Sequence, residues 1–374
     1  MKWYTRSTIK AGLLFLSALL CFQLLTAQDL KPGFDADEYL EMLRVTARQV
    51  DSATSASFPA PEHFTMEYRA EAGPMDNRWE LWTNSSKSIL VISVRGTTRK
   101  PISWVQNFYA AMIPAEGSIQ LNDSTTFQFK LAADAKATVH VGWTIGLGTM
   151  APGIIEKIKE YNSKYHTKQV IVTGHSQGGA IALLLRSYLH YEMEAGRLPK
   201  DLVLKSYNGA APKPGNLYYA YDYDYITRSG WGFTVVNALD WVPETPFSLQ
   251  TLRDFNNLNP FTDMDKALKK QSWLVRLYLK RVYGRMNRKS NKAQRVFTKY
   301  LGNTISKQVK QAMPQLRIPE YVANMNFTRA GSPIVLQPDA DYLKQYPDSG
   351  NRVFVHHGLM PYYLMTQRIY GKNP

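Results

Sequence analysis

The stretch Gly174-His175-Ser176-Gln177-Gly178-Gly179 decides the fold of this chain. Immediately before it, the run QVIVT at 169–173 is β-branched and apolar, which predicts a buried strand. Immediately after it, the run AIALLL at 180–185 predicts a buried helix. A serine with a glycine two residues before it and another two after it can occupy a strained turn between strand and helix, because neither glycine has a Cβ atom to collide there. The motif therefore predicts Ser176 as an exposed nucleophile.

A nucleophilic serine needs donors for the oxyanion that forms when it attacks an ester. The N–H of Gln177 begins the predicted helix, whose dipole favours negative charge. An apolar run at 88–94 predicts an earlier strand, which ends in Arg95-Gly96-Thr97-Thr98. We therefore predict that the backbone amides of Thr97 and Gln177 form an oxyanion hole. A plain turn with a capping threonine is the alternative interpretation of Thr97.

A histidine and an acid must complete such a site, because a serine hydroxyl is a poor nucleophile until a histidine removes its proton. Residues 232–237 predict a strand, and Asp240 follows in a loop that contains prolines, where the acid that orients the histidine is expected. Residues 352–355 predict a further short strand, which delivers His356 and His357. Both histidines are candidates. The order serine, aspartate, histidine is the chain order of α/β-hydrolases.

The segments between these residues predict the other elements of an α/β fold. We expect an amphipathic helix over 35–50, a hairpin over 78–94, loop or edge structure over 123–138, a helix over 154–165 and a strand over 201–207. His140 lies beside an apolar run and is expected to be structural. Residues 102–112 predict a helix with Trp104, Val105 and Phe108 on one face. This helix is either a core helix or a lid over the acyl site.

A basic segment lies between Asp240 and the two histidines. Twelve basic residues between positions 265 and 299 accompany a single acid, and apolar residues such as Leu279 alternate with them at helical spacing. We predict a helical insertion at about 247–319 that carries most of the excess positive charge, the chain having a formal net charge of +15. Such a segment can bind anionic lipid headgroups. A solvated helical face packed on the main domain is the alternative.

The N-terminus has the pattern of a targeting segment. A basic start and a short apolar run at 11–25 precede a small-residue cleavage motif that ends at Ala27. We predict a signal peptide over 1–27 and an exported domain over 28–374, with an uncleaved anchor as the alternative. The only cysteine, Cys21, lies in the signal peptide, so the mature chain would have no disulfide, no thiol nucleophile and no cysteine-ligated metal.

Taken together, these segments resemble the class 3 lipase family, the fungal-type lipases and their bacterial and plant relatives. The resemblance covers roughly residues 89–363 apart from the basic insertion, and it implies an α/β-hydrolase fold with a mostly parallel central sheet flanked by helices. The stretches that carry it are 91–97, 103–104, 139–142, 174–179, 212–216, 235–237, 240–243 and 357–362. It implies Ser176, Asp240 and His357 as the catalytic triad, since the frame beginning at His357 fits the family's terminal motif better than the frame beginning at His356.

These observations favour a secreted serine ester hydrolase that cleaves acyl esters of glycerolipids through an acyl-enzyme. A phospholipase, or a short-chain or carbohydrate esterase, would use the same triad. A non-catalytic lipid- or surface-binding protein is the remaining alternative, and the intact triad argues against it. We expect no cofactor and no metal, because the histidines show no ligand spacing such as H-x-x-x-H. We also expect a monomer that meets a lipid or other ester substrate at an anionic lipid interface, and no nucleic-acid partner, because no reading motif is present.

Overall fold

The computed structural model describes residues 30–371 except 51, 262–265, 267 and 349. The predicted signal peptide and Cys21 lie outside the described residues. Residues Pro32–Pro374 form one compact unit, and the architecture below is that of this unit.

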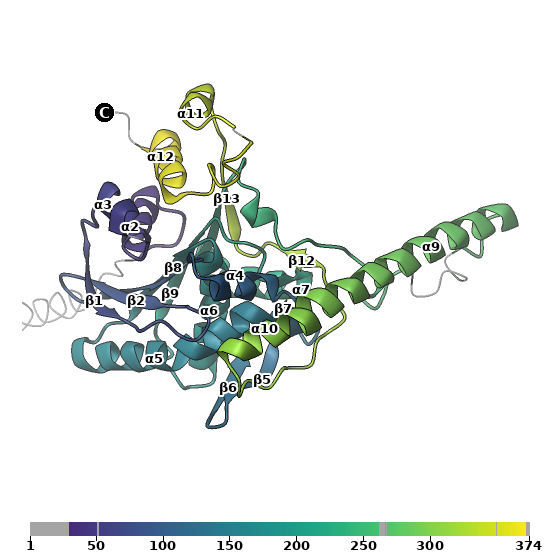
Figure 1. Cartoon of the computed structure of the whole chain (residues 1–374), viewed down its shortest axis with the longest axis horizontal. Helices are drawn as coiled ribbons and strands as arrows, with labels where there is room; N and C mark the ends of the chain where they lie inside the picture. Colours follow the sequence, from purple (N-terminus) through teal and green to yellow (C-terminus); the bar gives the residue numbers. More distant parts are fainter. Residues whose placement is uncertain (1–29, 51, 262–265, 267, 349, 372–374) are drawn as a thin grey trace, which may run out of the picture. The chain divides into compact units, whose positions relative to one another are not determined.

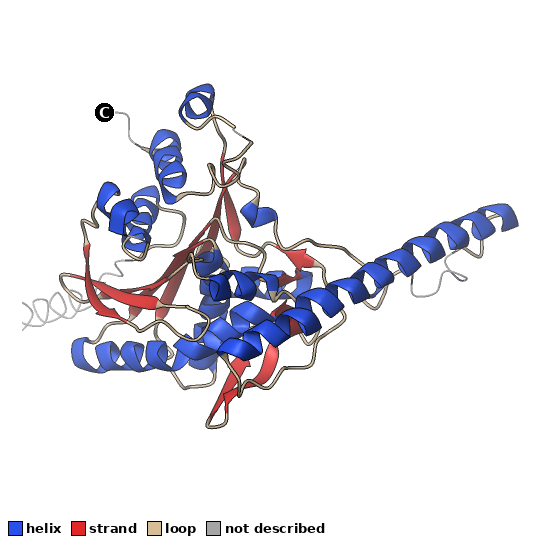
Figure 2. Ribbon diagram, in the orientation of Figure 1, coloured by secondary structure: helices blue, strands red, loops and turns tan. Residues whose placement is uncertain are grey.

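A seven-stranded sheet in the order β1-β2-β3-β8-β9-β11-β13 forms its centre (Figure 2). The strands are β1 (Phe64–Arg69), β2 (Trp79–Asn84), β3 (Ile89–Val94), β8 (Gln169–His175), β9 (Val203–Gly209), β11 (Gly232–Asn237) and β13 (Ser332–Leu336). The first three pair antiparallel, and the strands from β3 to β13 run parallel. β3, β8 and β11 are buried along their whole length, as expected of apolar strands covered on both faces.

The parallel strands end together at one edge of this sheet. Val94 at the end of β3 pairs with Gly174 of β8, and His175 at the end of β8 pairs with Gly209 of β9. The loops after β3, β8 and β11 therefore leave the sheet at the same edge, which is where open α/β sheets bind their ligands. The predicted hairpin and the predicted strands before Ser176 and Asp240 are confirmed.

Helices cover both faces of the sheet (Figure 1). On one side, α2 (Ala36–Ala47) packs against α12 (Leu359–Tyr370), and α2 contacts β3 and β8. On the other side, α5 (Val141–Tyr165) packs against α6 (Gln177–Glu194), and α6 contacts β3, β8 and β9. A mainly parallel sheet between two helical layers is the architecture predicted from the sequence, and this prediction is confirmed.

Shorter elements complete the main body. The helices are α3 (Ser52–Ser57), α4 (Pro101–Phe108), α7 (Leu217–Ile226) and α11 (Ala340–Gln345), with a 3-10 turn η1 (Val242–Glu244). A small sheet has the order β12-β10-β7-β4, formed by β12 (Phe327–Thr328), β10 (Gly215–Asn216), β7 (Thr138–His140) and β4 (Met112–Pro114). β5 (Glu116–Asn122) and β6 (Thr125–Lys130) form a hairpin. The helix predicted over 102–112 is therefore too long, because it ends at Phe108 and Met112 already belongs to β4.

The basic segment is largely helical where it is described. It contains the 3-10 turn η2 (Leu252–Asp254), the long helix α9 (Trp273–Thr298), the π-helical turn η3 (Lys299–Thr304) and α10 (Ile305–Ala312). α10 packs against α4, so this segment contacts the main body beside the sheet edge. Among the helices of the described residues, none is both long and apolar enough to span a bilayer.

The strand predicted at 352–355 is wrong. The chain forms turns there, and Val353 and Phe354 are 59% and 42% exposed, which a buried strand does not allow. The last strand of the sheet is instead β13, which pairs with β11 along its length. Pro333 and the exposed side chains of β13 hide the pattern of a buried strand, as is common at a sheet edge.

Candidate active site

Ser176 lies in a sharp turn between β8 and α6. Its backbone has φ 61° and ψ −132°, a conformation that costs energy for a residue with a side chain. The flanking glycines permit the turn: a Cβ atom on Gly174 would lie 2.4 Å from the carbonyl carbon of Gly178, and a Cβ atom on Gly178 would lie 2.2 Å from the carbonyl oxygen of Val94. α6 can therefore start directly against β3, and Ser176 remains partly exposed.

The structure brings three predicted residues into one hydrogen-bonded chain. The Nε2 atom of His357 lies 2.8 Å from Oγ of Ser176, and its Nδ1 atom lies 2.7 Å from Oδ2 of Asp240. The adjacent His356 points elsewhere, with Nδ1 2.8 Å from the hydroxyl of Tyr342 and Nε2 2.9 Å from a carboxylate oxygen of Asp348. Of the two candidate histidines, only His357 can accept the proton of Ser176 in this arrangement.

Asp240 is buried, and two donors besides the ring of His357 hold its carboxylate. The hydroxyl of Tyr362 donates to Oδ2 of Asp240 at 2.8 Å, and the N–H of Val242 donates to Oδ1 at 3.0 Å. Burial alone would raise the pKa of Asp240, but the hydrogen bond and electrostatic effect of His357 and these two donors outweigh it, so the net pKa lies below its usual range. The carboxylate therefore stays ionised and can orient the imidazole and stabilise the imidazolium.

His175 holds the loop that carries His357, a role that the sequence analysis missed. Its Nε2 atom lies 2.6 Å from the carbonyl oxygen of His357, and its ring lies at the end of β8 next to the serine. Burial, followed by the electrostatic effect of the neighbouring His357, lowers the pKa of His175 to about 3, so its ring is neutral and its Nε2–H donates to that carbonyl. The position inside the Ser176 motif was the available signal, but nothing in the sequence indicated the partner.

The loop after β3 brings Thr97 close to Ser176. A Cβ atom on Gly96 would lie 2.8 Å from the carbonyl oxygen of His175, so a glycine is needed for this close approach. The hydroxyl of Thr97 accepts a hydrogen bond of 2.9 Å from the side-chain amide of Asn107. The same Asn107 accepts a hydrogen bond of 2.8 Å from the side chain of Gln177. One residue of α4 thus links the two predicted oxyanion residues.

Asp76 fixes the other end of this loop. Its buried carboxylate accepts a hydrogen bond of 2.6 Å from the hydroxyl of Thr98 and forms ion pairs with Lys100 at 2.9 Å and Arg95 at 3.2 Å. Burial would raise the pKa of Asp76, but these contacts, the Lys100 hydrogen bond first, give a net lowering. Residues 95–100 are therefore anchored on both sides of Thr97, and no pattern in the sequence indicated this contact.

The helix that the sequence analysis interpreted as a core helix or a lid, α4, turns its polar side inward. Ser103 and Gln106 are buried, and Gln106 exchanges two hydrogen bonds with Asn77 at 2.8 and 2.9 Å. Trp104 and Phe108 are exposed instead. The core-helix interpretation is therefore wrong for Trp104 and Phe108, and buried side-chain hydrogen bonds help to attach α4 to the protein. Val105 is half-buried beside the core.

Exposed aromatic rings surround the approach to His357. The ring of Phe354 lies 5.9 Å from the ring of His357, 6.0 Å from Trp104 and 5.3 Å from Trp241. The indole N–H of Trp241 donates to the carbonyl oxygen of Val353 at 2.7 Å, which fixes this turn against the Asp240 loop. We call Trp104, Trp241 and Phe354 the aromatic rim. The rim is therefore an exposed apolar surface next to the candidate nucleophile.

His140 occupies the structural position that the sequence predicted. It caps α5, where its Nδ1 accepts the N–H of Trp143 at 3.2 Å, and its Nε2 lies 3.1 Å from the carbonyl oxygen of Asn107. Burial lowers the pKa of His140 to about 3, so the ring is neutral. It supports the backbone of the residue that links Thr97 and Gln177.

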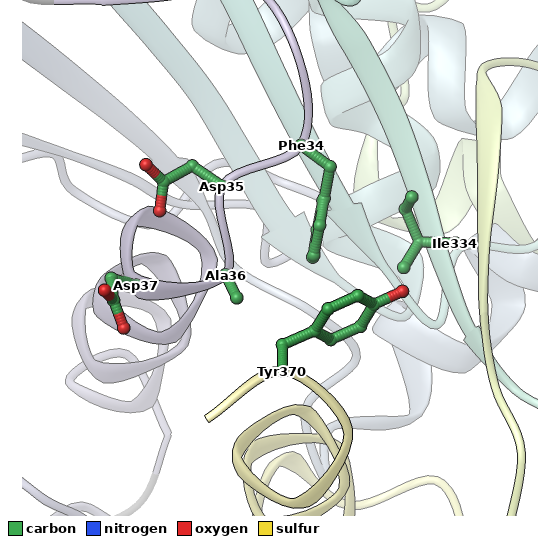
Figure 3. Close-up of a pocket in the computed structure, with 6 residues that line it drawn as sticks. All are labelled: Phe34, Asp35, Ala36, Asp37, Ile334 and Tyr370. Atoms are coloured by element: carbon green, nitrogen blue, oxygen red, sulfur yellow. The ribbon is translucent and has the colours of Figure 1, made fainter. Parts of the chain in front are cut away.

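A separate cavity of about 450 Å³ lies between the start of α2, the end of α12 and β13 (Figure 3). Phe34, Ile334 and Tyr370 face one another there, whereas the carboxylates of Asp35 and Asp37 point away (Figure 3). The cavity therefore offers no convergent polar groups for catalysis. In the part of the chain that is described, no group of three or more histidine, cysteine, aspartate or glutamate side chains is placed to hold a metal ion.

The partly exposed serine at a strand–helix elbow, on a mainly parallel sheet with helices on both faces, defines an α/β-hydrolase fold. Residues 91–250 match the family model described as Lipase (class 3). The resemblance to class 3 lipases that the sequence predicted is therefore confirmed for this segment, which contains Ser176, Asp240, Thr97 and Gln177.

Known relatives match the chain over limited stretches. A secreted mono- and diacylglycerol lipase of Malassezia restricta is 26% identical over 159 residues, which cover 42% of this chain and 47% of that protein. A lipase of Rhizopus niveus is 35% identical over 111 residues, which cover 29% of this chain and 27% of that protein. The solved triacylglyceride lipase of Rhizomucor miehei is 18% identical, with a TM-score of 0.42. The match covers 58% of this chain and 77% of the lipase chain. The chain thus spans less than half the length of the curated relatives named here.

Proposed function

We propose that this protein is a secreted serine lipase that cleaves acyl esters of glycerolipids through an acyl-enzyme on Ser176. The observation that carries the proposal is the continuous hydrogen-bonded chain from Ser176 through His357 to Asp240 at an exposed elbow. The match of residues 91–250 to class 3 lipases, and the relatives named as lipases, support the same reaction.

In the first half of the proposed reaction, Nε2 of His357 takes the proton of Ser176 while Oγ attacks the ester carbonyl carbon. The carbonyl oxygen becomes an oxyanion, which the backbone amides of Thr97 and Gln177 stabilise. His357 then gives the proton to the alcohol oxygen as its bond to carbon breaks, which leaves an acyl ester on Ser176. In the second half, water replaces the alcohol: His357 removes its proton, the hydroxide adds to the acyl carbon, and Ser176 leaves with that proton.

The aromatic rim supports a lipid ester as the substrate class. Trp104, Trp241 and Phe354 present apolar surface to solvent beside His357, where a soluble short-chain ester would need no such surface. The exposed face of α4 extends this surface with Phe108. A phospholipase reaction with the same triad is the second candidate, and the specific observation that favours it is the positive charge of the basic segment, which suits anionic headgroups.

We further propose that the protein is exported through residues 1–27, works as a monomer and meets an anionic lipid interface through residues 247–319. The printed name of the Malassezia restricta relative, a secreted lipase, supports export. The excess of lysine and arginine in α9 supports the anionic interface.

Initial rates on p-nitrophenyl esters of increasing acyl length, measured below and above the concentration at which each ester forms an interface, test this function. We expect the rate to rise sharply for long chains at the interface and Ser176→Ala to abolish hydrolysis throughout. A preference for short soluble esters without an interfacial rise would replace the lipase by an esterase. Hydrolysis retained by pure, folded Ser176→Ala would overturn the mechanism.

A further inference from the structure

One face of α9 carries an apolar tip followed by a ladder of positive charges. Its members are spaced three or four residues apart, which places them on one side of a helix. We call this set the α9 ladder; it consists of Trp273, Leu277, Arg281, Arg285, Arg288, Lys292 and Arg295. All seven side chains are exposed. The hydrophobic tip is pronounced, with Trp273 70% and Leu277 60% exposed to solvent.

The opposite face of α9 is attached to the protein, so the ladder has a fixed outward direction. Tyr283 packs against Phe261, with ring centroids 5.2 Å apart. Further along, the guanidinium of Arg253 donates to the side chain of Gln294 at 2.8 Å, and Gln294 and Phe297 are buried. Rotation of α9 that would hide the ladder against the main body would break these contacts.

The charge of α9 is unbalanced within the helix. It contains eight lysine or arginine residues and no aspartate or glutamate over 26 residues. A solvated surface helix normally carries both signs, which pair at i and i+4 and keep the net charge low. A helix of one sign with exposed tryptophan and leucine at one end is instead the pattern of a segment that lies on a charged lipid surface.

We propose that the α9 ladder docks the protein on an anionic phospholipid bilayer. Trp273 and Leu277, with the neighbouring exposed Leu274 and Tyr278, enter the boundary between headgroups and acyl chains. The arginines and lysine of the ladder bind the phosphate groups of the headgroups. Nucleic acid would also attract the charges, but it does not account for exposed leucine and tryptophan at the tip.

The ladder is joined to the proposed active site through packed elements. α9 continues through η3 into α10, and α10 packs against α4 (Figure 1). At this junction the N–H of Ala111 donates to the carbonyl oxygen of Leu301 at 3.2 Å, and the hydroxyls of Tyr109 and Tyr321 lie 2.7 Å apart. Docking through α9 would therefore involve a segment that packs on α4, the helix that carries part of the aromatic rim. This step rests on the proposed function; docking itself does not.

The test uses the full chain with Ser176→Ala, so that no lipid is consumed. Co-sedimentation is measured with vesicles of phosphatidylcholine alone and with vesicles containing 30% phosphatidylglycerol. We expect binding to the anionic vesicles only. The triple variant Arg281→Gln, Arg285→Gln, Arg288→Gln should weaken it by roughly 100-fold, because each charge near the surface contributes about fivefold. Trp273→Ala should weaken it by about tenfold through loss of the inserted ring.

A matched triple, Lys159→Gln, Lys164→Gln, Lys200→Gln, removes the same charge from exposed positions away from α9. It should bind within about twofold of the parent, whereas equal losses in both triples would reduce the ladder to a net-charge effect and overturn the proposal. Equal binding to neutral vesicles would also overturn it. Competition with a DNA duplex gives a further test. If the duplex displaced the protein from anionic vesicles at a lower concentration than additional anionic vesicles did, the ladder would be assigned to nucleic acid and the proposal would be overturned. Urea midpoints of all variants verify that they are folded.

Hydrolysis of p-nitrophenyl butyrate by protein that retains Ser176 separates this proposal from the proposed function. The ladder triple should leave that soluble rate unchanged, since the ladder does not touch Ser176, His357 or Asp240. Vesicle binding without any ester hydrolysis would retain the ladder and reject the lipase. Hydrolysis with no vesicle binding would retain the lipase and reject the ladder.

Discussion

Ser176 adopts a left-handed φ of 61° directly between a buried strand and a buried helix. The packing of the buried strand and the buried helix holds this turn in its strained conformation. The turn directs the hydroxyl of Ser176 away from the sheet edge and toward His357. At this scale the sequence could identify the serine, the aspartate and their order, because each has a local pattern. It could not identify His175 or Asp76, whose partners lie at least 19 residues away along the chain and become neighbours only on folding.

The two adjacent histidines give a sharp prediction. His357→Asn should lower kcat by about 10⁴-fold or more, because no group then accepts the proton of Ser176. His356→Asn retains a side chain that can bond to the Tyr342 hydroxyl and should keep kcat within about threefold. Soluble-ester kinetics on both purified variants provide the measurement. A larger loss in His356→Asn would move the proton acceptor by one residue.

At the scale of elements, the close contact of α6 with β3 and the anchored loop after β3 create the site. α6 approaches β3 at Gly178, where any side chain would overlap the carbonyl of Val94. The periodicity of the sequence predicted β8, α6 and β11 well because each is apolar and long. It failed for α4, whose buried face is polar and satisfied by Asn77 and Gln177, since periodicity assigns apolar residues to the core.

Gly178→Ala tests the tight packing of α6. We expect it to destabilise the protein by about 3 kcal/mol and to remove activity, because the backbone must move to accept the Cβ atom. Gly284→Ala is the control, since a Cβ atom there meets no atom within 4 Å, and we expect it to be neutral or to stabilise by about 0.5 kcal/mol. Urea unfolding of both variants gives the comparison. Equal stability of the two would show that the elbow has more room than the structure indicates.

Asp76 gives a pH-dependent prediction for the loop that carries Thr97. The pKa of Asp76 is lowered in the folded protein. Its contribution to the free energy of unfolding is therefore fully present above the pKa of the unfolded state, about 3.9, and is lost as the pH falls through the pKa of the folded state. Asp76→Asn should therefore cost about 2 kcal/mol at pH 7, and the gap to wild type should shrink below about pH 4. Urea unfolding from pH 3 to pH 7 measures this gap. A gap that widens toward acid would contradict the assigned direction. Activity on soluble esters should fall as well, mainly in kcat.

For the whole molecule, the positive charge and the aromatic rim have separate locations. The aromatic rim lies at the sheet edge, and the α9 ladder lies on the segment between Asp240 and His357, while the net charge of the chain is +15. Composition predicted a basic helical insertion, because charge and helical spacing are local properties. It could not predict that α10 packs on α4, because this contact joins segments about two hundred residues apart.

This separation predicts two different salt responses. Raising NaCl from about 20 to 500 mM should lower the rate on an anionic lipid emulsion by roughly tenfold, because screening weakens the contact of exposed charges with headgroups. The rate on p-nitrophenyl butyrate should change by less than twofold, since the chemistry of the triad does not depend on that contact. A parallel fall of both rates would indicate that salt acts on the site itself.

The most direct test of the central claim is covalent trapping of the nucleophile. The purified protein is incubated with a long-chain alkyl fluorophosphonate, and the modified peptide is located by mass spectrometry. We expect one phosphonyl group on Ser176, added at a rate that falls by several orders of magnitude in His357→Asn and changes little in His356→Asn. Modification of another residue, or labelling of Ser176 that does not depend on His357, would contradict this expectation.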